Sequence, residues 1–272
     1  YVAVMGGCVE YAGATKLANM SAAALRVGCG VVTLAVPQSI TNAVLPYLLE
    51  STLLPIPADA NGKMIYTPEI LDSILHRYAS IAVGMGWGSS NSYKDILSHL
   101  IKKATQPLII DADGLNTLSK MNLDILKEAN ASVILTPHLM EFSRLSGLSI
   151  SEIESDPITH AKAFAKEYGV VLLLKGCTTI VTDGEIVYLS NRGSAGMATA
   201  GSGDVLAGIL AGLCGYLEPN ALTVASGAFL AGMAGEFAEQ KCGAISMIAS
   251  DTVREIANAV CVLKKSRKYL KK

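Results

Sequence analysis

Residues 193–204 read GSAGMATAGSGD and continue without a break into the apolar helical pattern VLAGIL at residues 205–210. A glycine-rich loop that opens a helix is typical of an anion-binding site, because its backbone can approach a ligand and the unpaired amides of the first turn attract negative charge. A bound phosphate would repel Asp204, which favours a proton-transfer role for this carboxylate. The alternative interpretation is an ordinary N-cap, a position at which aspartate is common.

Around this loop, strand-like apolar runs alternate with helical patterns. The expected strands lie at residues 1–5, 31–36, 81–83, 107–110, 132–135 and 170–174, and the expected helices at residues 14–27, 205–216, 220–239 and 250–263. Continuous apolar runs separated by helices indicate a parallel sheet that is buried on both faces. Residues 178–182 and 185–189 flank an Asp-Gly pair, which predicts a hairpin. We therefore predict a single α/β domain over residues 1–272 with a mostly parallel central sheet.

The composition narrows the class of protein further. Of the 272 residues, 51% are hydrophobic and 17% are charged, and the formal net charge is −1. This balance predicts a large core and gives no sign of a surface for nucleic acid. The apolar run at residues 205–217 is too short to cross a membrane. We expect a small-molecule ligand, with neither nucleic acid nor membrane as a partner.

Six cysteines occur without a C-x-x-C pair and without a histidine at metal-ligand spacing. They predict reduced thiols and a cytoplasmic protein. Because the chain begins at Tyr1, already inside an expected strand, we also expect a segment upstream of it. The basic stretch at residues 264–272 predicts a solvated terminus, with binding to anionic lipid or nucleic acid as the alternative.

Ligands of open parallel sheets collect beyond the carboxyl ends of the strands, and glycine-rich or polar sequences follow five of the expected strands. These sequences are GG at residues 6–7, GMGWG at 84–88, DADGLN at 111–116, TPHLMEF at 136–142 and KGCT at 175–178. Taken singly, each is also compatible with a turn, a helix cap or a solvated strand end. Their shared position favours one ligand site that includes Asp113 and Asn116.

The order of these motifs, with YAGA at residues 11–14 and GMATAGSGD at 196–204, resembles the ADP-dependent NAD(P)H-hydrate dehydratases of bacteria, a branch of the ribokinase-like superfamily. The resemblance extends over nearly the whole chain. It implies a three-layer α/β/α fold, a homotetramer, and dehydration of the S epimer of hydrated NADH or NADPH with release of AMP and phosphate. Eukaryotic relatives that prefer ATP tend to carry CGGQGD where this chain has TAGSGD at residues 199–204, which favours ADP over ATP.

Carried over position by position, the resemblance implies that Asp204 is the catalytic base and also contacts the substrate. It implies further substrate-binding positions at Ala14, Gly86 and His138, with Glu141 to Arg144 close by. For the nucleotide, it implies Lys175, Gly176, Cys177, Thr178, Thr179 and Gly203, with the amides of Ala200, Gly201 and Ser202 next to the transferred phosphoryl group. A Mg²⁺ ion bridging the diphosphate is expected as well. Two positions depart from the family: Met85 replaces a common proline and Met140 a common glycine.

Two other functions remain open from the sequence. ATP-dependent kinases of small alcohols, such as hydroxyethylthiazole or hydroxymethylpyrimidine, share this fold and the GSGD ending of the loop, and fold alone does not fix function. A nucleotide-binding protein without catalysis is the third possibility. A kinase would leave a lasting phosphoester, whereas a dehydratase releases free phosphate and restores the reduced nicotinamide.

Overall fold

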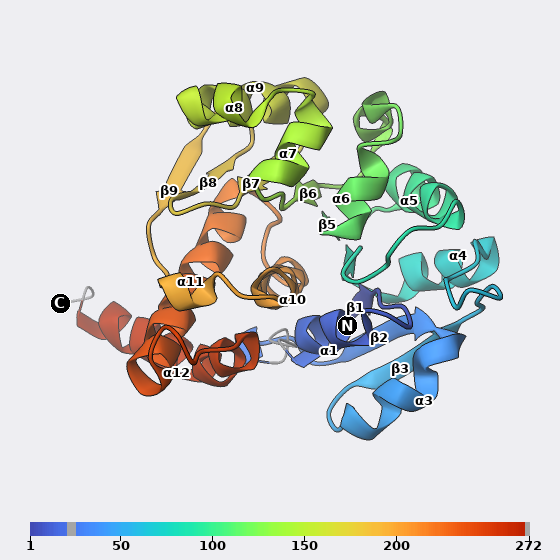
Figure 1. Ribbon diagram of the computed structural model, residues 1–272, viewed down its shortest axis with the longest axis horizontal. Helices are drawn as coiled ribbons and strands as arrows, with labels where there is room; N and C mark the ends of the chain where they lie inside the picture. Colours follow the sequence, from blue (N-terminus) through green and yellow to red (C-terminus); the bar gives the residue numbers. More distant parts are fainter. Residues whose placement is uncertain (21–25, 270–272) are drawn as a thin grey trace.

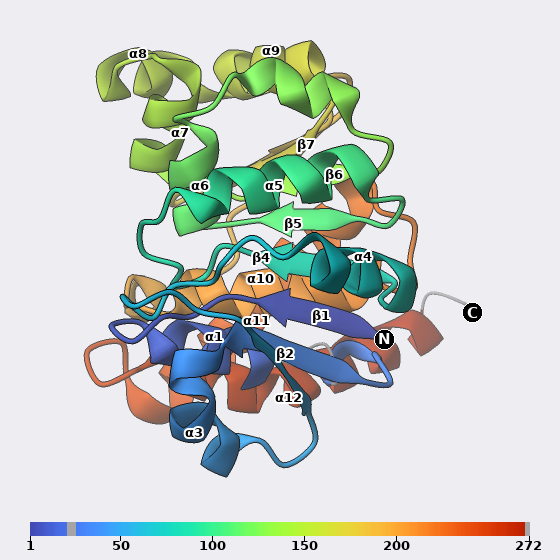
Figure 2. The same ribbon diagram turned by 90° about the vertical axis from the view of Figure 1, so that its right-hand side faces the viewer.

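The computed structural model describes residues 1–20 and 26–269, which fold into one nine-stranded sheet with helices on both faces (Figures 1 and 2). The strands are β1 (Val2–Met5), β2 (Val32–Pro37), β3 (Thr52–Ile56), β4 (Ser80–Val83), β5 (Leu108–Ile110), β6 (Val133–Leu135), β7 (Val171–Leu174), β8 (Thr179–Thr182) and β9 (Val187–Ser190). Every predicted strand is present, and the three-layer α/β prediction is confirmed.

The helices follow the strands in the order expected for such a fold. They are α1 (Ala12–Met20), α3 (Thr41–Val44), α4 (Pro68–Arg77), α5 (Ser92–Lys103), α6 (Asp113–Leu118), α7 (Leu139–Ser146), α8 (Ile150–Ser155), α9 (Pro157–Tyr168), α10 (Ser202–Cys214), α11 (Ala221–Cys242) and α12 (Ala249–Tyr269). The last three confirm the helices predicted after the glycine loop. Part of the helix expected at residues 14–27 lies outside the described residues, as do residues 270–272 of the basic terminus. Helix α12 continues as far as Tyr269, and Lys264 and Lys265 on it are exposed, as expected for a solvated terminus.

The strand order is β3-β2-β1-β4-β5-β6-β7-β8-β9. The seven strands β1 to β7 are parallel to one another. Strand β8 is antiparallel to both of its neighbours and forms the predicted hairpin with β9. The sequence did not predict β3. Its residues, TLLPI, are largely half-exposed and include Pro55, which a strand tolerates at the edge of a sheet because one side of its backbone is unpaired there.

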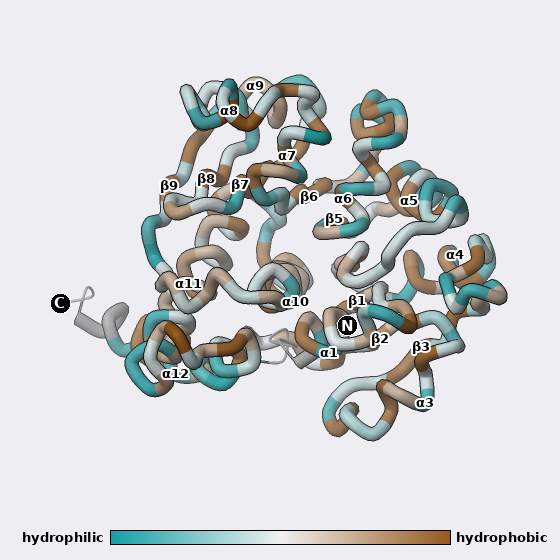
Figure 3. Tube along the Cα trace, viewed as in Figure 1, coloured by the Kyte–Doolittle hydropathy of each residue, from teal (hydrophilic) through white to brown (hydrophobic). Residues whose placement is uncertain are grey.

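The two faces of the sheet bury two separate hydrophobic cores. In β1, Val2 and Val4 belong to the core beneath α10, α11 and α12, whereas Ala3 and Met5 belong to the core beneath α4, α5 and α9. This alternation follows from the two-residue period of a strand and explains why the central strands are apolar throughout. In Figure 3, α10 and α11 are coloured as apolar helices, whereas α4 and α12 mix polar and apolar residues.

Helix α11 is long and apolar enough to pass a length-and-composition test for a membrane span. However, 67% of its most apolar window lies buried inside the structure, where it packs against α10, α12 and the strands β7 to β9. Core helices of globular proteins have this property. Helix α10, at 13 residues, is shorter than a span.

The chain reverses its direction of travel across the sheet between β1 and β4, which lie side by side. At such a reversal, the loops that leave the two strands diverge and open a crevice at the carboxyl ends. The loops after β1, β4, β5, β6, β7 and β9 all begin at this edge of the sheet. The fold therefore brings together the motifs that were predicted to share a site.

Candidate active site

The loops after β1 and β4 form the floor of the crevice. The Gly7 amide donates to the Met85 carbonyl oxygen at 2.8 Å, and Gly86 adopts φ +65° close to the Ala14 methyl group. A Cβ atom on Gly86 would lie 2.9 Å from that methyl group, so the two positions predicted for the substrate pack directly against each other. Trp87 fixes this loop, because its indole Nε1 donates to the Met5 carbonyl at 3.1 Å and its ring stacks on Tyr93.

In the loop after β5, the strained residue Ala112 lies between the carboxylates of Asp111 and Asp113. Ala112 has φ 50° and ψ −120°, and it is the only non-glycine residue with positive φ among those described. Such a conformation costs about 1–3 kcal/mol and is usually found at functional sites. The two carboxylates on either side of Ala112 have different partners: Asp111 contacts Lys175, whereas the Asp113 carboxylate accepts the Gly88 amide at 2.7 Å.

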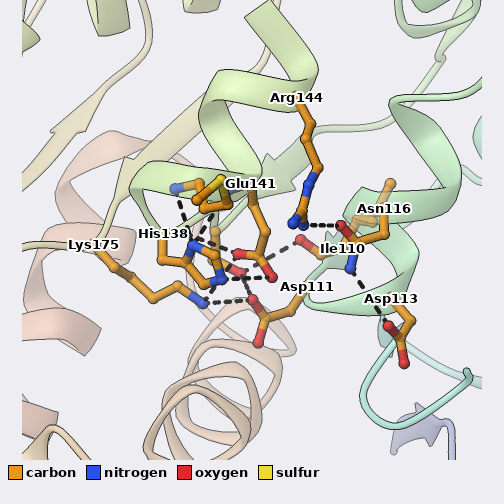
Figure 4. Close-up of polar contacts among 10 residues, drawn as sticks. Ile110, Asp111, Asp113, Asn116, His138, Glu141, Arg144 and Lys175 are labelled. Atoms are coloured by element: carbon orange, nitrogen blue, oxygen red, sulfur yellow. Dashed lines mark hydrogen bonds and ion pairs between the residues drawn. The ribbon is translucent and has the colours of Figure 1, made fainter. Parts of the chain in front are cut away.

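Four side chains that follow three strands, β5, β6 and β7, meet at the centre of the crevice (Figure 4). The Lys175 ammonium lies 2.8 Å from an Asp111 carboxylate oxygen and 3.9 Å from Glu141, and the Thr136 hydroxyl donates to the same Asp111 oxygen at 2.8 Å. Burial alone would lower the pKa of Lys175, but the charges of Asp111 and Glu141 outweigh it and raise the pKa. Burial raises the pKa of Glu141. Lys175 therefore carries a positive charge and lies between the carboxylates of Asp111 and Glu141.

His138 has a structural role as a helix cap, and its contact with the substrate stays a prediction. Its Nδ1 accepts the amides of Met140 and Glu141 and thereby caps α7, while the Glu141 carboxylate accepts the His138 amide at 2.8 Å. Burial and the nearby Lys175 lower the pKa of His138, so the imidazole is neutral at pH 7. The side chain remains 52% exposed, which leaves its outer edge open to a ligand.

Helix α10 presents a free N-terminus to this cluster. Gly201 is its N-cap, with φ +94° and no capping side chain, and Asp204 is the third helical residue. The cap interpretation of Asp204 is therefore wrong. Within the described residues, the amides of Gly203 and Asp204 have no hydrogen-bond acceptor. A Cβ atom on Gly203 would lie 3.3 Å from the Lys175 ammonium, so these amides and that cation flank the same space.

The environment of Asp204 favours its protonated form. Burial first, and then the negative charge of Asp111, raise its pKa to about 7, although Lys175 opposes the shift. A carboxyl group whose pKa lies near physiological pH can both accept and release a proton there, as a general base requires.

A pocket of about 520 Å³ lies beside the glycine loop; we call it the α10 pocket. Six predicted nucleotide-binding residues line it: Lys175, Gly176, Cys177, Thr179, Ser202 and Gly203. Thr178, Ala200 and Gly201 do not. The pocket also has a lining that the sequence did not predict, from Asn191, Arg192, Ala228, Ala231, Gly232 and Thr252. Among the described residues, the buried hydroxyl oxygens of Ser202 and Thr252 have no partner.

A second pocket, of about 610 Å³, lies on the other side of the cluster beside α6; we call it the α6 pocket. Its lining includes the predicted Asp113 and Asn116 and the neighbouring Arg144, but not Ala14, Gly86, His138, Glu141 or Asp204, which lie toward the centre of the crevice. Glu10, Tyr11, Lys63, Ser89, Thr117, Ser119 and Lys120 line it as well and were missed. Three of these residues adjoin predicted positions: Tyr11 opens the YAGA motif and packs against Gly86, and the hydroxyls of Thr117 and Ser119 donate to the backbone carbonyls of Asp113 and Asn116 at 2.8 and 3.0 Å. The others come from turns and helix ends without a motif.

The carboxylates of the crevice suit a magnesium ion that is held mainly by phosphates. No group of three histidine, cysteine or acidic side chains in the described part of the chain forms a ready metal cage. Mg²⁺ commonly binds through one or two carboxylates together with the phosphate oxygens of a substrate, and Asp111 and Asp204 next to the free α10 amides provide that donor chemistry.

The family model described as NAD(P)H-hydrate dehydratase matches residues 2–258. The chain belongs to this family. An ADP-dependent (S)-NAD(P)H-hydrate dehydratase from Nitrosopumilus maritimus is 32% identical over 262 residues, with 95% of this chain and 88% of the relative covered. A bifunctional NAD(P)H-hydrate repair enzyme from Moorella thermoacetica is 36% identical over 92% of this chain. This chain spans 47% of that relative, about half its length.

Among solved structures, an ADP/ATP-dependent NAD(P)H-hydrate dehydratase from Bacillus subtilis, co-crystallised with ATP and Mg²⁺, superimposes with a TM-score of 0.79. The superposition covers 94% of this chain and 89% of that structure, at 23% identity. It shows that this member of the NAD(P)H-hydrate dehydratase family has the fold of that enzyme.

Proposed function

We propose that this chain catalyses the ADP-dependent dehydration of hydrated NADH or NADPH, with Asp204 as the general base. The observation that carries the proposal is the position of Asp204, a carboxyl group with a pKa of about 7 beside the free amides of α10 and the Lys175 ammonium. The cluster lies between two pockets, each within the range of volumes that hold a nucleotide-sized ligand.

ADP occupies the α10 pocket in this proposal. Its β-phosphate accepts the amides of Gly203 and Asp204 and contacts the Lys175 ammonium, a combination suited to a phosphoryl group that gains charge during transfer. The adenosine lies toward the small side chains of Ala228 and Ala231 on α11. The unpartnered hydroxyls of Ser202 and Thr252 are available for polar contacts with the same ligand.

The substrate carries a hydroxyl group that is a poor leaving group. Asp204 accepts the hydroxyl proton while the oxygen attacks the β-phosphorus, and the bond between this phosphorus and the bridging oxygen of ADP breaks to release AMP. The lone pair of the ring nitrogen then expels phosphate, and loss of a proton from the neighbouring ring carbon restores the dihydronicotinamide. A bound Mg²⁺ would neutralise part of the phosphate charge, with Asp111 and Asp204 as its nearest protein ligands.

The organisation of the protein is part of the proposal. We infer that residues 1–272 act as one domain, that the protein works in the cytoplasm, and that it assembles as a homotetramer. ATP is a possible replacement for ADP. The relative from Nitrosopumilus maritimus, which is described as ADP-dependent and is covered over 88% of its length, supports ADP as the preferred nucleotide.

The proposal is tested by incubating the protein with hydrated NADH or hydrated NADPH and with ADP or ATP. Recovery of reduced-nicotinamide absorbance together with stoichiometric AMP and free phosphate is the expected result. A stable phosphoester without recovery of absorbance would identify a small-alcohol kinase instead. Binding of ADP without any turnover of either hydrate would contradict the assigned reaction.

A further inference from the structure

The α6 pocket has an excess of positive charge at its rim. Three cations (Lys63, Lys120 and Arg144) line it against two carboxylates (Glu10 and Asp113), and only Lys63 has a carboxylate partner, since its ammonium lies 2.7 Å from Glu10. That contact lowers the pKa of Glu10 to about 2, so the pair is fully ionised and mutually neutralised. Within the described residues, neither Lys120 nor Arg144 contacts a carboxylate.

Arg144 is held in place by a neutral group. Its guanidinium donates to the Asn116 amide oxygen at 2.7 Å, and the Asn116 amide nitrogen in turn donates to Asp113 at 3.4 Å (Figure 4). The guanidinium therefore keeps its charge and most of its donors for a ligand. Arg144 also lies one helical turn beyond Glu141, so the pocket rim and the central cluster share helix α7.

The two ends of the crevice consequently differ in sign. At the centre, three carboxylates (Asp111, Glu141 and Asp204) surround the single ammonium of Lys175. At the rim, Lys120 and Arg144 have no carboxylate partner in the part of the chain that the structure describes. A ligand that fits both ends has an uncharged reacting group at one end and an anionic group at the other. A hydrated dihydronicotinamide ring is uncharged, and phosphates supply the anionic end.

We propose that Lys120 and Arg144 bind a phosphate group of the dinucleotide substrate and thereby anchor it in the α6 pocket with its hydroxyl group toward Asp204. This inference rests on the proposed function. The phosphate is either the 2′-phosphate of NADPH or the pyrophosphate that NADH and NADPH share. Both cations are exposed, so the contact is weakened by salt.

The test compares KM and kcat for hydrated NADH and hydrated NADPH in the wild type, Lys120→Gln and Lys120→Arg. Lys94→Gln is the control, because Lys94 is an exposed lysine on α5 that does not line the pocket. For Lys120→Gln we expect KM to rise about fivefold with little change in kcat, since an exposed charge-assisted hydrogen bond is partly screened. Lys120→Arg should restore KM, and added salt should raise the wild-type KM more than that of Lys120→Gln.

The two sources of phosphate give different patterns. A rise in KM for hydrated NADPH alone identifies the 2′-phosphate, and an equal rise for both substrates identifies the pyrophosphate. KM values in Lys120→Gln that match those of the control for both substrates would overturn the proposal. If the wild type turns over neither hydrate, the proposed function fails. The anchor is then judged by whether NADPH raises the melting temperature of the wild type but not of Lys120→Gln.

Discussion

The α10 pocket and the α6 pocket lie on either side of one cluster of charged residues but are built from different parts of the chain. Around the α10 pocket, the polar contacts that we propose for ADP come from the free backbone amides of α10 and from Lys175, next to small side chains of α11. Around the α6 pocket, the proposed polar contacts come from charged side chains that belong to different loops and helices. Recognition by backbone depends on loop conformation, whereas recognition by side chain depends on individual charges.

This difference has a consequence for mutation. Replacing a side chain that merely lines the α10 pocket should change little, because its backbone keeps the contact. Replacing a glycine there should change much more. At the central cluster, replacing a side chain should have a large effect, because each charge there influences the protonation of its neighbours.

Asp204→Asn removes the proton acceptor while preserving the shape of the site. We expect kcat for hydrated NADH to fall by about 100-fold or more, because a positioned general base contributes about that much. The dissociation constant for ADP, measured by calorimetry, should stay within about twofold, since the α10 amides are unchanged. Asp95→Asn, at an exposed carboxylate on α5, serves as the control and should be fully active. Near-wild-type activity of Asp204→Asn would remove this residue from the mechanism.

Lys175→Gln removes the cation that faces both the α10 amides and Asp111. ADP binding should weaken by about 10- to 100-fold, the loss expected for a charge-assisted contact of about 1.5–3 kcal/mol. Because Lys175 lowers the pKa of Asp204, the acidic limb of the pH–kcat profile should also move to higher pH. Lys166→Gln, which breaks an exposed ion pair with Glu185, should alter neither quantity. Tight ADP binding in Lys175→Gln would show that backbone amides suffice.

Gly201→Ala tests the backbone of the glycine loop. Gly201 has φ +94°, and a methyl group there would collide with the Leu17 side chain, so the loop must shift. We expect ADP binding to weaken about tenfold, as strain of this kind costs about 1–3 kcal/mol. Gly147→Ala is a matched control with φ +74° and open space around it, and it should reduce stability without affecting ADP. Equal ADP affinities in the two variants would argue against a backbone cradle.

The pH dependence of stability follows from the raised pKa of Asp204. In the folded state this pKa is about 7, against an ordinary value of 3.8, so folding favours the protonated form. The stabilising contribution is complete below pH 3.8 and is lost as the pH rises through about 7. Thermal unfolding at pH 5 and pH 8 should therefore show that Asp204→Asn gains stability over the wild type at the higher pH, by about 2–4 °C if the difference is near 1 kcal/mol. A gain of the same size at both pH values would contradict the assigned pKa.

Cys177→Ser should have the smallest effect. Cys177 is exposed and lines the α10 pocket, but the neighbouring glycine suggests that the backbone of this turn, and not the thiol, contacts the ligand. The ADP dissociation constant should change by less than about twofold, which is within the range of a lost weak hydrogen bond. A change of tenfold would mean that a side chain contributes substantially to the α10 pocket.

The sequence predicted the parts of the molecule that have a local signal. Apolar runs between helices predicted the sheet, and the glycine loop before an apolar helix predicted the free α10 terminus. Strand β3 has no such signal, because it contains Pro55 and lies at the exposed edge of the sheet, so its sequence lacks a continuous apolar run. The contact of Lys175 with Asp111 joins residues 64 positions apart, and that of Lys63 with Glu10 joins residues 53 apart. Long-range pairs of this kind arise only after the sheet has brought the strand ends together.

Trp87 is the single tryptophan of the chain, and it lies fully buried in the loop between Gly86 and Gly88. An indole stacked on Tyr93 and shielded from water should emit at short wavelength. Because Gly86 contacts Ala14 and the Gly88 amide is bonded to Asp113, a ligand that moves this floor also alters the surroundings of the indole. The intrinsic fluorescence of this protein can therefore report occupancy of the crevice without an attached label, and stopped-flow measurement would separate binding of the hydrate from its turnover.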